Sequence, residues 1–427
     1  MERYEAYKDS GVEWIGEIPS HWDVHPLGAH STMIVPMRDK PTRFDGDIPW
    51  IRIEDFDGKY IATSKSEQNV SDGLITEMNL KVYPIGTVLC SCSCNLGVCA
   101  IVKRPLCSNQ TFIGCVPAEH ELDSDFLFYL MISMDRRLNY LSSGTIQTYL
   151  SRHDFEHLAV QIPPIHEQGI IANYLDARTT EIDALVADCE REVGLLREYR
   201  KAVISEAVTK GLDPDAPLKD SGVEWIGEIP EGWLVHPSKT LFAEGKELRH
   251  PNDEQCAASQ KYGIIPQAQY IALENQRMVA ADKNLDAWKH VEPGDFVISL
   301  RSFQGGLELS SISGCVTWHY IVLKGSCLVE STYYKYLFKT QKYIESLQRT
   351  CTYIRDGQDL RYSNFVQVPL PLPPRKEQFA IGAYLDSKTA EIDSLIDAKQ
   401  SMADKLREYR KSLISEAVTG KFKVPGV

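Results

Sequence analysis

The sequence lacks the features that would assign it to a membrane, a secretory route or a disulfide framework. No apolar run approaches the roughly 20 residues of a membrane helix. The N-terminus, MERYEAYKDSGVEW, has no apolar core of the kind that signal peptides carry. Eleven cysteines is an odd count in a large chain without an export signal, which opposes a disulfide framework. They include no C-x-x-C pair, which leaves little support for a structural zinc site. We therefore expect a cytoplasmic protein with no membrane partner and no metal.

Positive charge is also scarce, since 46 Lys and Arg face 59 Asp and Glu, for a net charge of −13. This balance excludes a generic basic coat for nucleic acid. The acid is unevenly placed, however. The net charge, counted as Lys and Arg minus Asp and Glu, is 12 − 16 = −4 for residues 26–162 and 15 − 14 = +1 for residues 237–372. For the rest of the chain it is 19 − 29 = −10. Local basic patches on these two segments therefore remain open.

Two internal repeats organise the chain. The twelve residues KDSGVEWIGEIP occur at 8–19 and again at 219–230, which is 219 − 8 = 211 positions later. A longer repeat relates 163–209 to 373–419 at a constant offset of 210, and its copies share EQ, YLD, EID, LREYRK and ISEAVT. The chain therefore reads as a short repeat, an insert and a long repeat, twice over.

The two inserts, residues 26–162 and 237–372, share little sequence. Both nevertheless contain a Pro/Gly turn that enters an apolar strand, PIGTVLCS at 84–91 and PGDFVIS at 293–299. We expect one fold used twice with diverged loops. The tryptophans of each short repeat are expected to pack the insert against a helix end; the alternative is a base-stacking surface.

Each long repeat has the period of a coiled coil. Pro163 and Pro164 precede the first copy, and Gly211 and Pro214 follow it as helix stop signals. Apolar residues recur every seven positions between them, which is typical of helices that pair along a seam. The expected seam residues are Leu175, Ile182, Leu185, Cys189, Leu196 and Val203 in the first copy and Leu385, Ile392, Leu395, Met402, Leu406 and Leu413 in the second.

The predicted fold class is α/β (α+β). Two globular domains of like fold are joined by two long helices that form an antiparallel coiled coil, with pseudo-twofold symmetry. One such helix alone would expose its apolar seam, whereas two helices of one chain can bury it against each other.

Longer motifs run through the chain in a fixed order. They are SGVEWIGEIPxxW at both positions, PWIRIEDFDG at 49–58, ISLRSFQGGLELS at 298–310, and the helices PPxxEQ…YLD…EID…LREYRK…ISEAVT. In these motifs and their order the sequence resembles the specificity (S) subunit of type I restriction-modification systems, over essentially the whole chain.

The resemblance implies a DNA-reading subunit without chemistry of its own. Each insert would be a target recognition domain that reads one half of a bipartite, asymmetric target in double-stranded DNA. The helices would set the spacing and bind two modification subunits, adenine-N6 methyltransferases that bring S-adenosylmethionine. A restriction subunit is a further implied partner, whose presence in the host the sequence leaves open. The chain itself would hold no catalytic residue and no cofactor.

What the sequence lacks agrees with a non-catalytic chain. No Gly-rich turn of the forms G-x-G-x-x-G or G-x-x-x-x-G-K-[ST] occurs to hold a cofactor phosphate. The two Pro-Pro pairs read IPPIH and LPPRK, without the Asn or Asp and the aromatic residue of an amino-methyltransferase loop.

The expected domain organisation follows the repeats. It comprises an N-terminal conserved segment at 1–25, a first recognition domain at 26–162, a central conserved region at 163–236, a second recognition domain at 237–372 and a distal conserved region at 373–427, with long helices at about 166–210 and 376–420.

Candidate DNA contacts are exposed Arg, Lys, Asn, Gln and Thr side chains on the inserts, because these groups read base edges and bind phosphates. In the first insert they are Arg38, Lys40, Arg43, Lys65, Asn109, Gln110, Gln147, Thr148 and Arg152. In the second they are Arg249, Lys261, Gln267, Gln269, Arg301, Gln304, Arg355, Gln358 and Arg361. Arg301 and Gln304 lie in a motif of the family and suit phosphate contact better than base readout. For each residue the alternative is an ordinary solvated surface position.

Two other functions stay open at this point. The chain could be a scaffold or adaptor whose inserts bind proteins, which the acidic net charge would favour. It could also be a methyltransferase in its own right, which the missing motifs oppose. The half-site sequences, the length of the gap between them and the oligomeric state of the chain cannot be read from the sequence.

Overall fold

The computed structural model describes residues 2–36, 39–93, 96–142, 149–274, 285–299, 302–350 and 360–427. The chain divides into two compact units. Unit 1 comprises Met1–Glu190 and Ser401–Val427, and unit 2 comprises Arg191–Gln400. Each unit contains one short repeat, one insert and a part of both long helices, as the repeats of the sequence predict.

The two long repeats form the helices α5 (Ile165–Lys210) and α12 (Arg375–Val418). Proline pairs precede both helices, and glycines with positive φ follow them, Gly211 at 79° and Gly420 at 68°. These residues start and stop the helices because proline cannot extend a helix toward its N-terminus and glycine tolerates the left-handed backbone. Among the described residues, no helix is both long and apolar enough to cross a bilayer.

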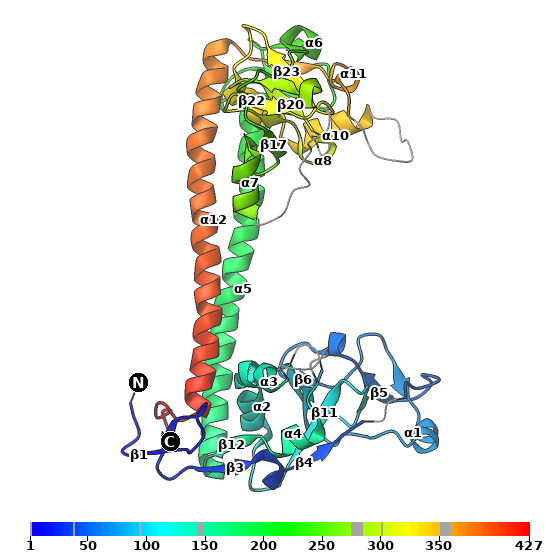
Figure 1. The fold of residues 1–427 in the computed structure, drawn as a ribbon, viewed down its shortest axis with the longest axis vertical. Helices are drawn as coiled ribbons and strands as arrows, with labels where there is room; N and C mark the ends of the chain where they lie inside the picture. Colours follow the sequence, from blue (N-terminus) through cyan, green and yellow to red (C-terminus); the bar gives the residue numbers. More distant parts are fainter. Residues whose placement is uncertain are drawn as a thin grey trace. The chain divides into compact units, whose positions relative to one another are not determined.

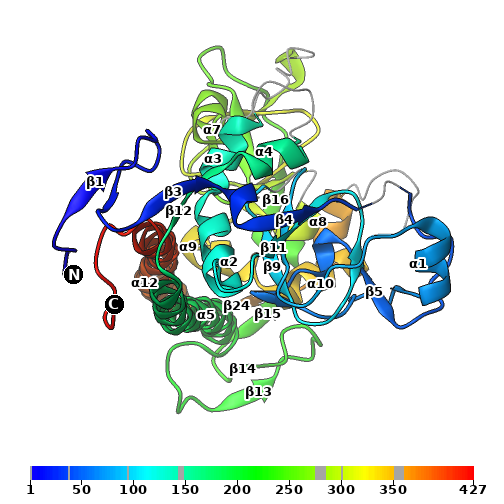
Figure 2. The ribbon, with the colours of Figure 1, turned by 90° about the horizontal axis from the view of Figure 1, so that it is seen from below.

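Within each unit the two helices pack antiparallel. In unit 1, Asp183 and Glu190 of α5 form ion pairs with Arg410 and Arg407 of α12, respectively. Residue numbers thus rise along one helix as they fall along the other. In unit 2, Glu192 and Asp393 pair with Lys399 and Arg200 in the same sense, and Figures 1 and 2 show the two helices side by side. The predicted antiparallel coiled coil is confirmed.

The row of buried and half-buried side chains alternates steps of four and three residues from Leu175 to Leu196 on α5 and from Leu385 to Ile396 on α12, and steps of seven residues also occur farther on. On α5 it contains Leu175, Thr179, Ile182, Val186, Cys189, Val193 and Leu196, and Val203 is partly buried farther on. On α12 it contains Leu385, Thr389, Ile392, Ile396, Ala403, Leu406 and Leu413. Each α12 residue of this row has a number 210 higher than that of an α5 residue of the row.

Three expected seam residues lie outside this row. Leu185, Leu395 and Met402 are 43%, 46% and 48% exposed. The row steps by four residues from Ile182 to Val186, so Leu185 precedes the buried position by one residue, or about 100° of rotation. Leu395 occupies the same position of the second copy, and Met402 likewise precedes a buried alanine. Apolar character alone therefore misplaced these three side chains.

The insert of unit 1 contains a five-stranded sheet of order β4-β11-β8-β9-β6 and a three-stranded sheet of order β10-β5-β7. Its strands are β3 (Asp23–Pro26), β4 (Ser31–Ile34), β5 (Ile48–Ile51), β6 (Tyr60–Ile61), β7 (Asn69–Val70), β8 (Val88–Ser91), β9 (Cys99–Val102), β10 (Cys107–Ser108), β11 (Phe112–Pro117) and β12 (Ala159–Ile162). Its helices are η1 (Leu27–Ala29), η2 (Ile53–Asp55), α1 (Asp72–Met78), α2 (Ser124–Ser133), α3 (Asp135–Leu141) and α4 (Arg152–Glu156).

The main core of unit 1 lies between α2, the larger sheet and the long helices. Phe126 and Leu130 of α2 meet Ile101 and Ile113 of the sheet there. The cysteines of the CSCSC segment that the structure describes, together with the nearby Cys99, are buried in the same core. Burial raises the pKa of the Cys92 thiol to about 11, so this thiol stays neutral and acts as a small core side chain.

The insert of unit 2 contains a four-stranded sheet of order β16-β23-β20-β21 and three further strand pairs, β15-β24, β17-β18 and β19-β22. Its strands are β15 (Leu234–His236), β16 (Phe242–Gly245), β17 (Cys256–Ser259), β18 (Gly263–Pro266), β19 (Lys289–Val291), β20 (Phe296–Ile298), β21 (Glu308–Leu309), β22 (Gly314–Val316), β23 (Ile321–Gly325) and β24 (Leu370–Leu372). Its helices are α6 (Ser238–Leu241), α7 (Gln267–Glu274), η3 (Leu285–Ala287), α8 (Ser302–Gly305), α9 (Ser331–Leu337), α10 (Gln341–Arg349) and α11 (Tyr362–Phe365).

Both inserts are closed in the same way at their root. Strand β3 pairs antiparallel with β12 in unit 1, and β15 pairs antiparallel with β24 in unit 2, so the two ends of each insert leave side by side. The second strand of each pair, β12 or β24, leads within three residues into a long helix. The prediction of one fold used twice is confirmed.

The short repeats form equivalent hairpins, β1 (Tyr7–Asp9) with β2 (Glu17–Pro19), and β13 (Leu218–Asp220) with β14 (Glu228–Pro230). The first hairpin packs beside the end of α12, where Lys421 Nζ donates to the carbonyls of Ile15 and Glu17 at 3.0 and 2.7 Å. In unit 2, Trp233 packs into one core with the end of α5. Junction packing is therefore what the tryptophan clusters do.

Candidate nucleic-acid interface

Three segments of the first insert meet around the candidate Gln110. Cys92 N donates to Thr111 O at 2.9 Å, and Leu150 N donates to Cys92 O at 2.8 Å. Ser93 and Tyr149 form an isolated bridge beside them. Gln110 is exposed at this junction, so its amide is available to a ligand.

Asn109 precedes Gln110 but has a structural task. Its Oδ1 accepts from Thr111 N at 3.3 Å and from Thr111 Oγ1 at 2.6 Å, which fixes the turn after β10. The amide oxygen is therefore occupied by hydrogen bonds within the protein, and Asn109 is less exposed than Gln110. Of the two adjacent candidates, Gln110 is the better placed for recognition.

The exposed basic candidates Arg43 and Lys65 face acidic partners. Arg43 Nε lies 3.1 Å from Asp45 Oδ2, and Arg43 Nη2 lies 3.2 Å from Glu77 Oε2. Lys65 Nζ lies 3.6 Å from Asp57 Oδ2. Such exposed pairs are each worth about 0–1 kcal/mol, so a phosphate could replace the carboxylate partners at little cost.

The other described candidates of the first insert are held locally. Lys40 Nζ lies 5.9 Å from the centre of the Phe44 ring. Arg152 opens α4, and its Nε lies 2.6 Å from Glu156 Oε1 one turn on. Arg152 follows the Tyr149–Leu150 segment and so belongs to the neighbourhood of Gln110.

In the second insert, Lys261 and Gln304 lie on segments that approach closely. A Cβ at Gly305 would lie 2.3 Å from Gln260 Nε2, so α8 touches the turn between β17 and β18. Ile264 and Ser310 form an isolated bridge just beyond. Lys261 and Gln304 are both exposed, and Lys261 Nζ sits 4.7 Å from the Tyr262 ring centre.

The remaining described candidates of this insert lie on three other segments. Arg249 N donates to Trp288 O at 2.8 Å, and Arg361 N donates to Asn364 Oδ1 at 3.1 Å, where it opens α11. Gln267 and Gln269 lie on α7. Six candidates fall outside the described residues, namely Arg38, Gln147, Thr148, Arg301, Arg355 and Gln358.

Two exposed aromatic side chains were missed by the sequence analysis. Tyr149, beside Gln110, is 50% exposed. Trp318, in the loop between β22 and β23, is 43% exposed and stacks on His319 with ring centres 3.4 Å apart. No local pattern separates such aromatics from the many that fill cores, so only the fold identifies them.

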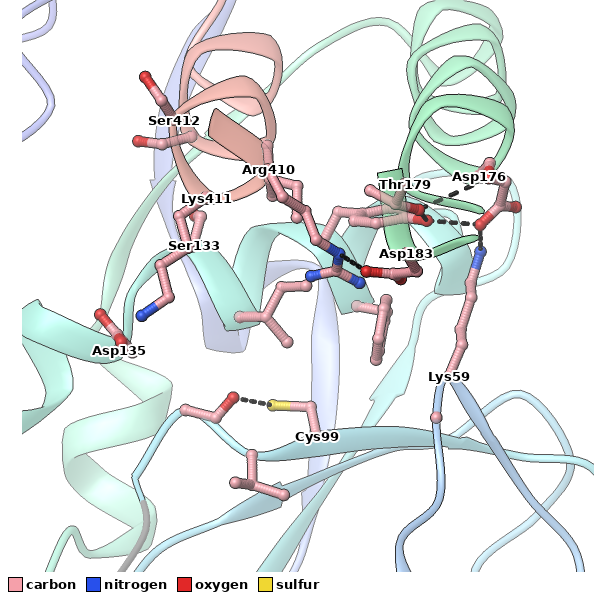
Figure 3. A pocket seen from close by; sticks show the side chains of 18 of the residues that line it. Lys59, Cys99, Ser133, Asp135, Asp176, Thr179, Asp183, Arg410, Lys411 and Ser412 are labelled. Atoms are coloured by element: carbon pink, nitrogen blue, oxygen red, sulfur yellow. Dashed lines mark hydrogen bonds and ion pairs between the residues drawn. The ribbon is translucent and has the colours of Figure 1, made fainter. Parts of the chain in front are cut away.

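A network of charges fastens the first insert to α5, beside a cleft of about 1220 Å³ (Figure 3). Lys59 Nζ lies 2.5 Å from Asp176 Oδ1 and 2.7 Å from Asp125 Oδ1. Tyr129 Oη donates to the same Asp176 oxygen at 2.6 Å. Burial opposes the charge on Lys59, but the hydrogen bonds and charges of the two aspartates outweigh it and raise its pKa.

The second insert is fastened by the equivalent aspartate. Lys335 Nζ lies 2.5 Å from Asp386 Oδ1, and Tyr336 Oη donates to that oxygen at 2.6 Å. Asp176 and Asp386 are the same position of the long repeat, but their lysines come from unrelated places, a loop before β6 and helix α9. The repeated YLD motif could have indicated the aspartates, whereas nothing in the sequence indicated Lys59.

A buried glutamine repeats this attachment near the start of each long helix. In unit 1, Asp123 N donates to Gln168 Oε1 at 2.8 Å, and Gln168 Nε2 donates to two carbonyls at 2.9 Å. In unit 2, Glu330 N donates to Gln378 Oε1 at 2.8 Å, and Gln378 Nε2 donates to two carbonyls at 3.0 and 2.9 Å. Both inserts are therefore mounted on the helices by the same bonds.

The chain is similar to known proteins along its whole length. Residues 35–187 match the family model of the type I restriction modification DNA specificity domain. The MjaIX specificity subunit of Methanocaldococcus jannaschii is 28% identical over 231 residues, which cover 52% of this chain and 51% of that protein, so the match spans about half of this relative. The MjaVIII specificity subunit of the same organism is 23% identical and covers 95% of this chain and 94% of its own. The EcoKI specificity subunit of Escherichia coli is 22% identical, with 95% and 90% covered.

Solved structures share the fold. A chain from a study of complex assembly and conformational transition in the type I R-M system superposes with a TM-score of 0.69 at 17% identity, covering 94% of this chain and 98% of that chain. The HsdS subunit from Thermoanaerobacter tengcongensis has a TM-score of 0.54 at 17% identity and the same coverage.

Proposed function

We propose that this chain, which belongs to the family of type I restriction-modification specificity subunits, reads a bipartite and asymmetric DNA target with one insert on each half. The observation that carries the proposal is the identical mounting of two unlike inserts, through Gln168 and Asp176 in one unit and Gln378 and Asp386 in the other. Two like domains on a repeated frame would read the same half-site twice, whereas unlike domains read unlike halves.

The contacts within each half follow from the exposed groups. In the first insert, Gln110 offers both a donor and an acceptor to a base edge, and Tyr149 offers a stacking face beside it. In the second, Lys261 and Gln304 suit backbone contact at their shared corner. Gln110→Ala is expected to relax recognition at one base of one half, whereas Lys261→Ala should weaken binding to all sequences and lower the salt slope by about 1.

The long helices are proposed to set the gap and to dock two copies of one partner, the adenine-N6 methyltransferase subunit. Outside the buried row they expose apolar and aromatic side chains at matched positions of both repeats. Leu185 and Leu395 are 43% and 46% exposed, and Tyr199 and Tyr409 are 50% and 49% exposed. A surface that occurs twice suits two copies of the same subunit. S-adenosylmethionine and the flipped adenine would then be held by that subunit.

The net charge of −13 makes tight DNA binding by this chain alone unexpected at physiological salt. The methyltransferase subunits would complete the positive surface around the duplex. Tight and sequence-specific binding by the purified chain alone would contradict this part of the proposal.

The test is a map of N6-methyladenine across the host genome with and without this gene. Deletion should abolish methylation of one gapped, asymmetric motif, and restoring the gene should recover it. An unchanged map in a host whose methyltransferase subunit is expressed and active would overturn the proposal. Specific co-purification of that subunit without any effect on the map would favour an adaptor.

A further inference from the structure

A compact group of histidines and carboxylates lies in the second insert, away from Lys261 and Gln304. Single ligand atoms of Glu247, His250 and His290 lie within 4.8 Å of one another. The residues come from the loop after β16 and from β19. His250 Nε2 is 3.0 Å from Glu247 Oε1, and the two imidazole rings stack with centres 4.0 Å apart. Glu292 adds a second carboxylate, whose Oε1 is 3.6 Å from His290 Nε2.

The buried member of the group is oriented as metal-binding histidines are. The His290 side chain is 4% exposed, and its Nδ1 lies 2.8 Å from Asp253 Oδ2. A carboxylate on Nδ1 holds the proton there and leaves the lone pair of Nε2 directed at the cluster. The same Asp253 oxygen accepts from His250 N at 2.7 Å, so one carboxylate positions both histidine-bearing segments.

The two glutamates divide their oxygens between the histidines and a lysine. Their Oε1 atoms face His250 and His290, whereas their Oε2 atoms lie 3.5 Å (Glu247) and 3.9 Å (Glu292) from Lys324 Nζ. The lysine therefore neutralises part of the negative charge from the far side. A bound cation would share the two carboxylates with this lysine.

The two stacked imidazoles cannot share an ion as they stand, because a metal binds in the plane of an imidazole ring, so His250 must turn out of the stack to bind. Tetrahedral ligands at about 2.0–2.1 Å from zinc lie about 3.4 Å apart. His290 is fixed by burial, but the side chains of His250 and Glu247 are 51% and 47% exposed and can rotate. Two imidazoles with carboxylates form a ligand set for borderline-soft divalent metals rather than for calcium or magnesium.

We propose that Glu247, His250 and His290, with Glu292 as the fourth ligand, form a structural site for a divalent transition metal, with zinc as the natural occupant. The ion would clip the loop after β16 onto β19. The backbone already joins these segments, since His290 N donates to Glu247 O at 3.0 Å and Arg249 N to Trp288 O at 2.8 Å. The metal would also join these two segments through their side chains and would hold the loop that carries Arg249 in place. The proposal does not depend on DNA recognition.

The test uses the full chain, stripped with a chelator and then equilibrated with zinc buffered at about 10 nM free ion, a level at which structural sites fill. We expect one equivalent of zinc per chain by elemental analysis. His250→Ala and Glu247→Gln change half-exposed side chains, so folding should be preserved, and each should lower the zinc affinity at least tenfold. Cobalt in place of zinc should give the visible absorption of a tetrahedral site, lost in both variants.

The matched control is His157→Ala. His153 and His157 also stack, with ring centres 4.0 Å apart, and they lie four residues apart at the end of the first insert. Zinc binding that survives His157→Ala and is lost in His250→Ala supports the site. No bound zinc, equal binding by the variants of the site, or loss through His157→Ala alone would overturn it.

Discussion

Arg200 of α5 holds Asp393 of α12 through two parallel contacts, with Nε 2.8 Å from Oδ1 and Nη2 3.1 Å from Oδ2. Displacing both numbers by 210, with the helices exchanging roles, gives the pair Arg410 and Asp183, whose Nε and Oδ1 are also 2.8 Å apart. The same ion pair between the two helices therefore occurs once in each unit, because the long repeat occurs twice in the chain. The pairs fix the antiparallel register because each joins one definite position of α5 to one of α12.

Replacing Asp393 with arginine should destabilise unit 2 by about 1 kcal/mol, because it sets two guanidinium groups against each other at a partly exposed site. The double variant Arg200→Asp/Asp393→Arg should recover most of the loss. A double-mutant cycle on the thermal unfolding of the full chain measures the coupling. Strictly additive costs of the two single changes would show that the pair does not contribute.

Lys59→Met should loosen the attachment of the first insert, because it leaves Asp125 and Asp176 without their shared cation. Charged hydrogen bonds of this kind are worth about 1.5–3 kcal/mol, and partial exposure of both aspartates favours the lower end. Hydrogen exchange should accelerate in peptides of α2 and of the first turns of α5. Lys335→Met is the matched change and should affect only unit 2. Equal protection in the Lys59 variant and the native chain would refute the assignment.

The same network predicts a pH dependence. Burial acts to raise the pKa of Asp125, but hydrogen bonds from Lys59 and Tyr60 outweigh it and hold the pKa below its usual value. Since unfolded aspartate titrates near about 3.9, the stabilisation is complete above that pH and is lost as the pH falls through the lower folded value. The difference in thermal midpoint between the native chain and Lys59→Met should therefore shrink as the pH falls below about 3.9. A constant difference would exclude Asp125 as the partner.

Glu308 and Lys339 form an ion pair in which the glutamate is buried and the lysine is partly exposed. The Glu308 side chain is 3% exposed, Lys339 is 31% exposed, and Nζ lies 2.5 Å from Oε1. Burial raises the pKa of Glu308 although Lys339 opposes the shift. Lys339→Met should cost about 3 kcal/mol because it strands a buried charge, whereas Glu308→Gln should cost far less. Urea unfolding monitored within unit 2 compares them, and the reverse order would be inconsistent with a buried carboxylate.

Under the proposed function, exchanging residues 237–372 for the corresponding insert of a similar specificity subunit should change one half of the methylated motif and leave the other half and the gap unaltered. The expectation rests on β15, Gln378 and Asp386, which lie outside the exchanged segment and meet the insert as β3, Gln168 and Asp176 do in unit 1. Methylation mapping reads out both halves at once. A change in both halves would mean that the inserts do not read DNA independently.

The sequence repeats allowed the long helices, their pairing and the two like inserts to be predicted. Helix starts and stops, the pairing of α5 with α12 and the recurrence of the insert fold all follow from the proline and glycine punctuation and the seven-residue period. The period could not distinguish Leu185 from Val186, because neighbouring leucine and valine are equally apolar and only the partner helix decides which is covered.

The candidate contacts were less predictable, for a physical reason. Whether Gln110 faces solvent and Asn109 closes a turn depends on how three distant segments meet. The lysines that fasten the inserts differ in origin while their aspartates repeat, because the long helices keep a common sequence and the inserts have diverged. The histidines of the second insert lie far apart in the chain, and no spacing rule links His250 to His290.

The first hairpin packs on the end of α12, and Lys423 N donates to Glu2 O at 2.8 Å, so the last residues of the chain lie against the first. A gene rearranged to begin at the second short repeat and to continue through the present end into the present beginning would encode every contact described. Such a rearranged chain is expected to fold, because each hairpin, insert and helix segment keeps its neighbours within its unit.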